Sequence, residues 1–479
     1  MTTQHLDHRI GGQRVSAIAV VERRNPSDLG EVVSLAPEGD ADVLSTALDA
    51  AHAAQPGWAD ASPELRSDCV NRVADLLMAR TDEIGTLLAR EEGKTLPEAK
   101  AETMRAARIF RYFGGEALRL HGRSLPSTRP GMEVETRPEA LGVVGLITPW
   151  NFPIAIPAWK VAPALAFGNA VVLKPAGITG AVASAMADAI EEAGVPAGVF
   201  NLVFVPGRTA GSMARDPRVS AISFTGSTGV GRQLAGEAAV SGKRLQLEMG
   251  GKNPLVIMDD ADLDRAVQIA LDGCFFSTGQ RCTASSRLIV HDGIHDAFVA
   301  ALARRMAEVR VGNALDPQAQ IGPVASEEQR DGCEHYLSVA VREGGTLVQG
   351  GDRLRLATDG YFLSPALITG TSREMTVNQE EIFGPVASVI RVADLDEAIA
   401  VANDSTFGLS SGIVTRSLAN AHAFRKRVQA GMVMVNAPTA GVDYHVPFGG
   451  AKGSSYGPRE QGFAAADFYT RTKTIYINP

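Results

Sequence analysis

A cysteine among polar neighbours is the first candidate for chemistry in this sequence. Cys282 lies in residues 276–284 (FSTGQRCTA), between a predicted amphipathic helix over 262–275 and a predicted strand over 286–290. A thiol attacks only as the thiolate, which needs partial exposure and nearby donors or positive charge. The glycine and hydroxyls of this segment, together with Arg281, meet that need. Taken alone, however, the segment fits a buried, inert cysteine better.

Two further polar side chains follow predicted apolar strands. Glu248 ends one strand and precedes Gly250 and Gly251, which would let a substrate approach the carboxylate, so this residue could serve as a general base. Asn151 follows another strand and a Pro-Trp pair, where an amide N–H could stabilise an oxyanion. A surface glutamate and a turn asparagine are the simpler explanations of each motif by itself.

Two motifs suit a ligand that carries phosphate. Residues 226–231 (GSTGVG) follow a predicted strand over 219–224 and open a helix, where backbone N–H groups can hold phosphate and glycines let it approach. The spacing is not G-x-G-x-x-G, so a plain strand–helix turn remains the alternative. Lys174 ends another strand and could meet a ribose or phosphate, although a lone lysine there is more often only solvent-exposed.

Composition narrows the class of protein. The chain has 479 residues, enough for about three domains. Its net charge of −8 gives no indication of nucleic-acid binding. Four cysteines without a CxxC pair predict a reducing, cytoplasmic setting with neither disulfides nor a metal site. Residues 1–20 show no signal peptide, and three prolines interrupt the uncharged run over 141–159, so we expect no membrane association.

Apolar strands alternate with amphipathic helices from residue 141 onward, which predicts an α/β fold with parallel sheets covered on both faces. Such sheets bind ligands at the carboxyl ends of their strands. Residues 122–138 fit either a linker or a protruding hairpin, and the opening region is expected to supply helical packing without chemistry. Helices are predicted over 40–58, 63–88, 96–118, 154–167, 179–193, from 229, and over 292–309, 326–343 and 394–403; strands over 143–148, 170–173, 199–205, 219–224, 255–258, 286–290, 386–392, 431–436 and, as a terminal edge, 463–478.

Taken together, the motifs resemble the aldehyde dehydrogenase superfamily over nearly the whole chain. Seven stretches carry the resemblance, in the family's order: 148–153 (TPWNFP), 174–176 (KPA), 224–228 (FTGST), 247–252 (LEMGGK), 279–282 (GQRC), 381–385 (EIFGP) and 447–450 (PFGG).

The resemblance implies an aldehyde dehydrogenase-like α/β architecture in three parts. Residues 1–120 and 142–250 would form a Rossmann-like NAD(P)-binding domain, and 251–462 a catalytic domain. Residues 121–141 and 463–479 would form a small β bridging element. Such elements pair between subunits, which implies a homodimer or a homotetramer.

The resemblance also implies a mechanism. The Cys282 thiolate would attack an aldehyde, and Asn151 with the Cys282 backbone N–H would hold the oxyanion. Hydride transfer to a nicotinamide would leave a thioester, which water activated by Glu248 would hydrolyse. Lys160 and Glu460 would be supporting polar residues without a catalytic role.

Nine residues would contact the cofactor by the same resemblance. Lys174 would hold the adenine-side ribose or its phosphate, Ser227 would approach the pyrophosphate, and Glu381 would bond the nicotinamide ribose. The others are Thr148, Trp150, Ala176, Gly177, Gly226 and Phe383. NAD-preferring members often carry a glutamate where this chain has Gly177, so its absence favours NADP or dual use, with Arg208 as a suggested partner of the 2′-phosphate.

Substrate choice is predicted from smaller matches. Residues 278–286 and 442–462 resemble the branch that oxidises α-ketoglutaric semialdehyde (2,5-dioxopentanoate), and Arg281 could anchor its carboxylate. Succinic semialdehyde enzymes often place an arginine where this chain has Trp159, and an aromatic residue there widens the choice to apolar or aromatic aldehydes. Phe448 is expected in the same pocket.

Two rival functions remain open at this point. An acyl-transferring relative would pass the thioester to coenzyme A, but such members tend to lack the base that Glu248 supplies. A non-catalytic relative on the same scaffold would not need Cys282, Glu248 and Asn151 together.

Overall fold

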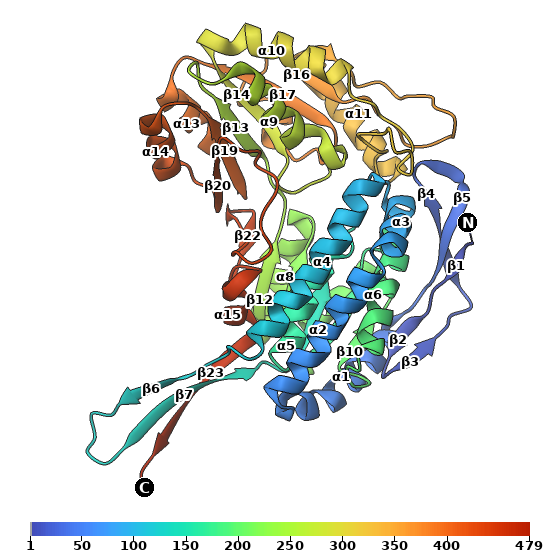
Figure 1. Cartoon of the computed structure of the whole chain (residues 1–479), viewed down its shortest axis with the longest axis vertical. Helices are drawn as coiled ribbons and strands as arrows, with labels where there is room; N and C mark the ends of the chain where they lie inside the picture. Colours follow the sequence, from blue (N-terminus) through green and yellow to red (C-terminus); the bar gives the residue numbers. More distant parts are fainter. Residues whose placement is uncertain (1) are drawn as a thin grey trace.

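The computed structural model describes residues 2–479. Two large sheets, each covered by helices, lie one above the other in Figure 1, and a narrow three-stranded sheet projects from the lower one. The two termini lie on opposite sides of the molecule in this view. The α/β class predicted from the sequence is confirmed.

The lower sheet has eight strands in the order β22-β12-β11-β8-β9-β10-β2-β3, of which the inner five are parallel. Its inner strands are almost wholly buried because helices cover both faces. Their bounds are β8 Val143–Ile147, β9 Ala170–Lys174, β10 Phe200–Leu202, β11 Val219–Thr225 and β12 Arg244–Glu248; the antiparallel edges are β22 Ser455–Tyr456, β2 His8–Ile10 and β3 Gln13–Val15.

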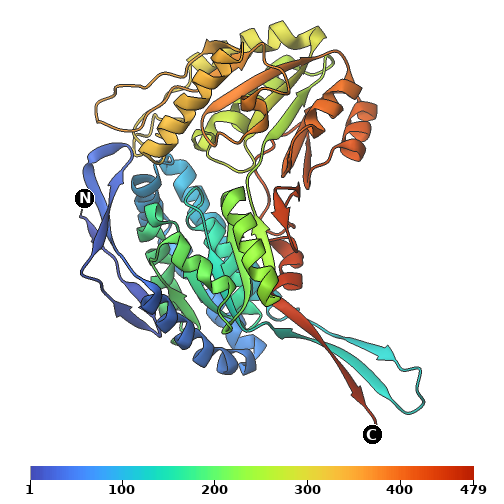
Figure 2. The same cartoon turned by 180° about the vertical axis from the view of Figure 1, so that it is seen from behind.

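Two separate apolar cores hold the helices against this sheet. One core packs α2 (Pro63–Ala79), α4 (Leu96–Glu116), α5 (Ala155–Ala166) and α6 (Gly180–Glu192) on one face. The other packs α1 (Ala41–Asp60) and α8 (Thr228–Ser241) on the opposite face, with α8 in the foreground of Figure 2.

The single helix predicted over 63–88 is wrong, because the structure divides it into α2 and α3 (Thr81–Glu92). Arg80 leaves helical geometry at ψ 16°, and the Thr81 hydroxyl donates to the carbonyls of Leu77 and Met78. The second half of the apolar pattern therefore belongs to a helix of its own.

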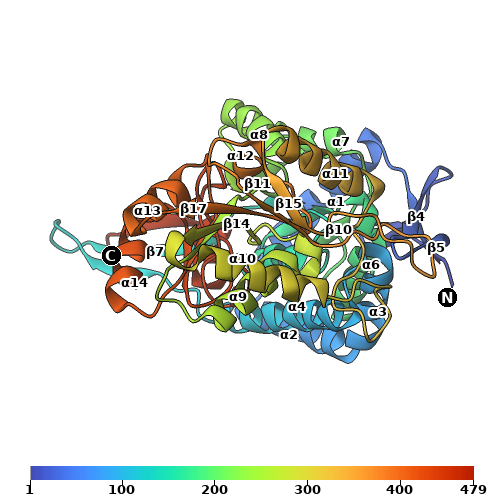
Figure 3. The same ribbon diagram turned by 90° about the horizontal axis from the view of Figure 1, so that it is seen from above.

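The upper sheet has seven strands in the order β15-β16-β17-β14-β13-β19-β20, all parallel except β15. Helices lie on both of its faces when it is seen from above (Figure 3). The bounds are β13 Asn253–Ile257, β14 Ser285–His291, β15 Thr346–Gln349, β16 Ala366–Thr369, β17 Val386–Val392, β19 Ser410–Val414, β20 Met432–Val435, α9 Leu263–Phe275, α10 Asp292–Ala307, α11 Glu327–Arg342, α12 Thr376–Gln379, α13 Leu395–Asn403 and α14 Leu418–Arg427.

The projecting sheet joins a hairpin to the end of the chain. β6 (Arg123–Pro126) and β7 (Glu133–Ala140) form the hairpin, and β23 (Thr470–Ile477) pairs antiparallel with β7. Residues 122–138 are therefore a protruding hairpin and not a linker (Figure 1).

The edge strand predicted over 463–478 is wrong in its first part, which forms the short helices η4 (Gly462–Ala464) and α15 (Ala465–Tyr469). Ala465, Phe468 and Tyr469 follow helical spacing and are buried in the first core of the lower sheet, which favours a helix there.

The smaller elements complete the chain. At the start of the chain, β5 is the middle strand of a three-stranded sheet. It pairs parallel with β1 and antiparallel with β4. These elements are β1 Gln4–His5, β4 Val20–Asn25, β5 Asp28–Pro37, η1 Gly177–Thr179, α7 Gly207–Gly211, η2 Ser212–Ala214, η3 Phe276–Gly279, β18 Phe407–Gly408 and β21 Ala451–Lys452. Within residues 2–479, no helix combines the length and the apolar character needed to cross a bilayer.

Candidate active site

The turn that precedes Cys282 has a strained backbone. Ser277 and Thr278 have φ angles of +50° and +53°, in the left-handed region that costs a non-glycine residue roughly 1 kcal/mol. The Ser277 N–H and hydroxyl both donate to Glu98 on α4, at 2.8 and 3.1 Å. The Thr278 hydroxyl donates to the Gly322 carbonyl at 3.2 Å. Neighbouring elements therefore hold the turn in a shape that it would not adopt by itself.

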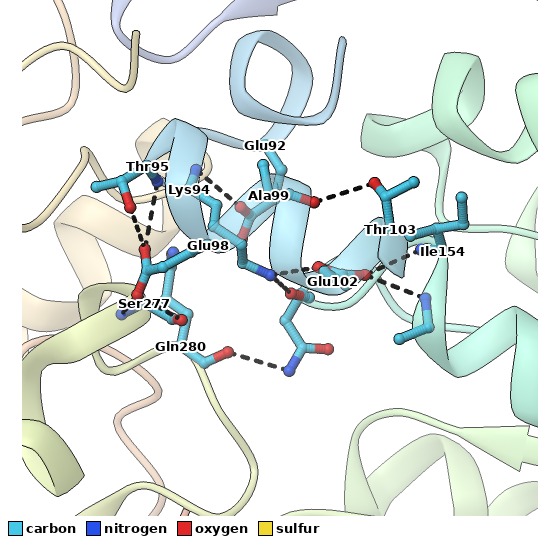
Figure 4. Close-up of polar contacts among 12 residues, drawn as sticks. Glu92, Lys94, Thr95, Glu98, Ala99, Glu102, Thr103, Ile154, Ser277 and Gln280 are labelled. Atoms are coloured by element: carbon cyan, nitrogen blue, oxygen red, sulfur yellow. Dashed lines mark hydrogen bonds and ion pairs between the residues drawn. The ribbon is translucent and has the colours of Figure 1, made fainter. Parts of the chain in front are cut away.

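A buried ion pair fixes the chain around Asn151. The Lys94 ammonium donates to Glu102 at 2.6 Å and to the Asn151 carbonyl at 2.7 Å. The other Glu102 oxygen accepts the N–H groups of Ile154 and Ala155, where α5 begins, both at 3.1 Å. Figure 4 shows Lys94 and Ile154 meeting Glu102 from two sides, with Glu98 turned toward Ser277. Because these contacts reach both Asn151 and the cysteine turn, the opening region is more than packing material, contrary to the expectation from sequence.

The Asn151 side chain faces the cysteine turn. Its amide nitrogen donates to the Gln280 carbonyl at 3.0 Å, and the side chain is buried. A carboxamide has two N–H donors, so one anchors the side chain and the second is left for another acceptor. This arrangement suits the predicted oxyanion role.

Cys282 is only partly covered, and it faces a cavity. Burial, followed by the nearby carboxylates of Glu381 and Glu248, raises the pKa of its thiol to about 12. The Cys282 carbonyl accepts from the Asn253 amide at 2.7 Å, which holds the backbone in place. The thiol is therefore protonated at neutral pH in this state of the protein.

Glu248 ends β12 beside the edge strand β22. The Ser455 hydroxyl donates to its carboxylate at 2.5 Å, a contact that follows from the pairing of the two strands. Burial, and then the charge of Glu460, raises the pKa of Glu248 well above its usual value. Glu460 itself forms a buried ion pair with Lys160, so both residues lie in the same polar cluster as Glu248. A carboxylate with a raised pKa is a stronger base toward water.

The cavity in front of Cys282 has a volume of about 460 Å³. Its aromatic wall includes Trp159 and Phe448, whose rings lie 5.4 Å apart, so both predicted pocket residues line it. Arg281 also reaches the lining, but its guanidinium donates to the carbonyls of Asp272 and Gly273 at the end of α9. The remaining lining residues are Lys94, Glu98, Ala101, Glu102, Arg105, Arg108, Phe152, Ile156, Ser277, Thr283, Gly441, Val442, Asp443 and Tyr444.

The residues predicted at the nicotinamide end come from both large sheets. Trp150 follows β8 and stacks edge-to-face on Phe383, with ring centroids 5.4 Å apart. Glu381 accepts the Gly251 N–H at 2.9 Å, and burial raises the pKa of its carboxyl to about 7. The buried Thr148 hydroxyl has no hydrogen-bond partner within residues 2–479, which leaves it free for a ligand.

The residues predicted at the adenosine end surround a second cavity of about 220 Å³. Lys174, Gly177 and Arg23 line it, and Ala176 directly precedes η1 beside it. The Arg23 guanidinium donates to the Gly177 carbonyl, and a Cβ on Gly177 would lie 3.1 Å from its Nη2. Arg208, the partner suggested from sequence, is exposed and does not line this cavity, whereas Arg23 does.

Gly226 and Ser227 lie where β11 turns into α8. Ser227 is the N-cap of α8, but its side chain makes no capping hydrogen bond, so the first N–H groups of the helix stay available for an anion. A Cβ on Gly226 would lie 2.6 Å from the Phe224 ring, so any other residue would require this ring to move. With the free Thr148 hydroxyl and the Lys174–Arg23 cavity, this helix start fits a phosphate-bearing dinucleotide.

The chain matches the model of the aldehyde dehydrogenase family over residues 15–475. It is 43% identical to an alpha-ketoglutaric semialdehyde dehydrogenase of Bacillus subtilis, over 96% of this chain and 95% of that protein. It is 44% identical to an alpha-ketoglutarate semialdehyde dehydrogenase of Haloferax volcanii, over 95% of each chain. A crystal structure of betaine aldehyde dehydrogenase from Staphylococcus aureus in complex with NAD+ superposes with a TM-score of 0.96 at 34% identity, over 98% of this chain and 94% of that one. The chain therefore belongs to the aldehyde dehydrogenase family, as the sequence motifs indicated.

Five residues at these sites were not predicted from the sequence: Arg23, Lys94, Glu98, Glu102 and Arg105. A signal for the last three exists, because Glu98, Glu102 and Arg105 recur at helical spacing and so lie on one face of the helix. Arg23 precedes Gly177 by more than a hundred residues, so no local pattern connects them.

Proposed function

We propose that this protein oxidises α-ketoglutaric semialdehyde to the carboxylate with NADP or NAD as the oxidant. The observation that carries the proposal is the environment of Cys282, which faces the cavity. The Asn151 amide bonds to the turn that precedes this cysteine, and the Glu248 carboxylate lies near enough to raise the pKa of its thiol. The two relatives at 43% and 44% identity, both named for this semialdehyde, support the choice of substrate.

The chemistry follows from the geometry. The Cys282 thiol releases its proton to solvent, the thiolate sulfur adds to the aldehyde carbon, and the resulting oxyanion accepts hydrogen bonds from the second Asn151 N–H and the Cys282 backbone N–H. A bound nicotinamide supplies the acceptor for the hydride that leaves this carbon. The product of that step is a Cys282 thioester. Glu248 then takes a proton from water, the hydroxide displaces the sulfur, and the carboxylate is released with the thiol restored.

Support for NADP or dual use comes from the cavity beside Gly177. Burial lowers the pKa values of both Arg23 and Lys174, and neither cation has a carboxylate within ion-pair distance in the described chain. Two desolvated cations without a counter-ion suit a 2′-phosphate. The exposed Glu38 at the same cavity is the only acid among the lining residues.

The aromatic wall favours a second candidate. Trp159, Phe448 and Phe152 line the cavity, and aromatic rings suit apolar or aromatic aldehydes and also quaternary ammonium groups. Betaine aldehyde has such a group, and betaine aldehyde dehydrogenases are among the relatives, one of them 39% identical. Succinic semialdehyde is a further carboxylated alternative.

Initial rates of nucleotide reduction test both choices. The panel contains α-ketoglutaric semialdehyde, succinic semialdehyde, pentanal, benzaldehyde and betaine aldehyde, each with NADP and with NAD. We expect kcat/KM for α-ketoglutaric semialdehyde to exceed that for pentanal at least about tenfold, a difference of about 1.4 kcal/mol. A lead for benzaldehyde, pentanal or betaine aldehyde would overturn the substrate proposal and leave the family assignment intact.

We also propose that the protein is a homodimer or homotetramer that assembles through the projecting sheet. Strand β6 is exposed along its whole length and β23 along most of it, so this sheet presents an unpaired edge and an open face. Light scattering on the purified chain tests the proposal, because a mass of one 50.4 kDa chain in solution would contradict it.

A further inference from the structure

We propose that Arg105, with Arg108 at the rim, binds the carboxylate end of the aldehyde substrate. This inference rests on the proposed function, and it names the residue that gives the site its preference for a carboxylated semialdehyde. The sequence suggested Arg281 as a candidate for this role, but its guanidinium is held by two backbone carbonyls.

The position of Arg105 follows from the periodicity of α4. Residues 98, 101, 102, 105 and 108 recur at helical spacing, and all of them line the cavity that Cys282 faces. Glu98 and Glu102 use the first part of this face to hold the turn and α5. The two arginines continue the same face toward the open end of the cavity, where Arg108 is exposed and Arg105 is only partly covered.

Burial lowers the pKa of Arg105, and the carboxylates of Glu102 and Asp443 offset this lowering only in part. Within residues 2–479, no carboxylate lies within ion-pair distance of its guanidinium. Its side-chain hydrogen bond, at 3.4 Å, goes to the amide oxygen of Gln461, a buried neutral residue that orients the guanidinium without cancelling its charge. A partly desolvated guanidinium that lacks a counter-ion is a binding site for a carboxylate.

Most of the other charged groups that line the cavity already have hydrogen-bond or ion-pair partners within the protein. Lys94 and Glu102 pair with each other, and Glu98 accepts from Ser277 and Thr95. Arg281 is held by two carbonyl groups at the end of α9. The exposed Asp443 is the one remaining acid of the lining, which also contains the two arginines Arg105 and Arg108, so an anion is favoured over a cation.

This charge balance distinguishes the two substrate classes that the aromatic wall permits. A carboxylate four carbon–carbon bonds from the aldehyde carbon would be attracted toward Arg105 while the aldehyde reaches Cys282. A quaternary ammonium group would meet the same guanidinium and be repelled. The aromatic rings would then pack on the methylene chain of the substrate.

The test compares α-ketoglutaric semialdehyde with pentanal, which has the same number of carbons and no charge. In Arg105→Leu we expect kcat/KM for the semialdehyde to fall about 10- to 100-fold, mainly through KM, while the value for pentanal changes less than about threefold. Arg105→Lys keeps a positive charge and should restore part of the loss. Arg111→Leu is the matched control, since Arg111 lies on the same helix, pairs with Asp75 and does not line the cavity.

A binding assay gives a second readout. Glutarate, an unreactive dicarboxylate of the same length, should slow alkylation of Cys282 by iodoacetamide in the wild type and in Arg111→Leu but not in Arg105→Leu. The inference is overturned if Arg105→Leu keeps its semialdehyde-to-pentanal ratio within about threefold of the wild type, or if glutarate still protects it. A wild type without any preference for the semialdehyde overturns the proposed substrate instead, whatever Arg105 does.

Discussion

Replacing Arg23 by leucine is the perturbation that bears most directly on cofactor choice. Arg23 reaches the adenosine-end cavity from β4, and its Nε donates to the Gly177 carbonyl. That contact leaves the terminal nitrogens free beside Lys174, where the 2′-phosphate of NADP would lie. Because an arginine stays protonated at any working pH, its charge is present even though burial lowers its pKa.

The size of the effect follows from the contact that is lost. A hydrogen bond to a charged group contributes about 1.5–3 kcal/mol, which corresponds to about a 10- to 150-fold loss in affinity for NADP. NAD has no phosphate at this position, so Arg23→Leu should change its affinity only through the lost contact with Gly177. That smaller loss is shared by both cofactors and cancels in the ratio of NADP to NAD affinities.

The assay measures dissociation constants for both cofactors by quenching of tryptophan fluorescence, and kcat/KM for each with one aldehyde. Arg24→Leu is the matched control, because Arg24 is exposed, bonds to Glu22 and the Leu29 carbonyl, and does not line the cavity. The reasoning is refuted if Arg23→Leu leaves the NADP-to-NAD ratio unchanged, or if Arg24→Leu shifts the ratio as strongly.

Two further predictions concern the catalytic end. Since burial raises the pKa of Cys282 to about 12, its alkylation by iodoacetamide without cofactor should accelerate about tenfold per pH unit between pH 7 and pH 9; a plateau below pH 9 would contradict the raised pKa. Glu102→Gln removes the charge that pairs with buried Lys94 and should lower kcat at least about tenfold by displacing Asn151, with the dissociation constant of the cofactor unchanged. Unchanged kcat in a folded Glu102→Gln variant would show that the ion pair supports the fold alone.

The elements that could be predicted from the sequence are those whose structure a local residue pattern determines. The buried strands ending at Glu248 and Lys174 and the helix before Cys282 follow from apolar periodicity, whereas the pattern over 122–138 left a linker and a hairpin equally open. The family motifs then identified the class of protein. Such patterns need no knowledge of which distant segments meet.

The contacts that were missed depend on tertiary packing. In the sequence, Glu102 is one polar residue among several on a helix. Only the packing of α4 against α5 shows that its carboxylate accepts the first N–H groups of α5, the helix that follows Asn151. Arg281 directly precedes the nucleophile in the sequence, yet its guanidinium donates a hydrogen bond to a backbone carbonyl at the end of α9. Arg105 and Arg23, to which we assign the two anion-binding roles, reach their cavities from segments far away in the sequence, so no local pattern indicates them.

The central claim is that the substrate passes through a thioester on Cys282. The most direct measurement is mass spectrometry of the Glu248→Gln variant, denatured in acid after mixing with α-ketoglutaric semialdehyde and oxidised cofactor. A general base contributes about 10²- to 10⁴-fold, so the variant should accumulate an adduct equal to the substrate less two hydrogens on the peptide that contains Cys282. The adduct should require both aldehyde and cofactor. Reduction of the cofactor without this adduct, or turnover by Cys282→Ser, would contradict the mechanism.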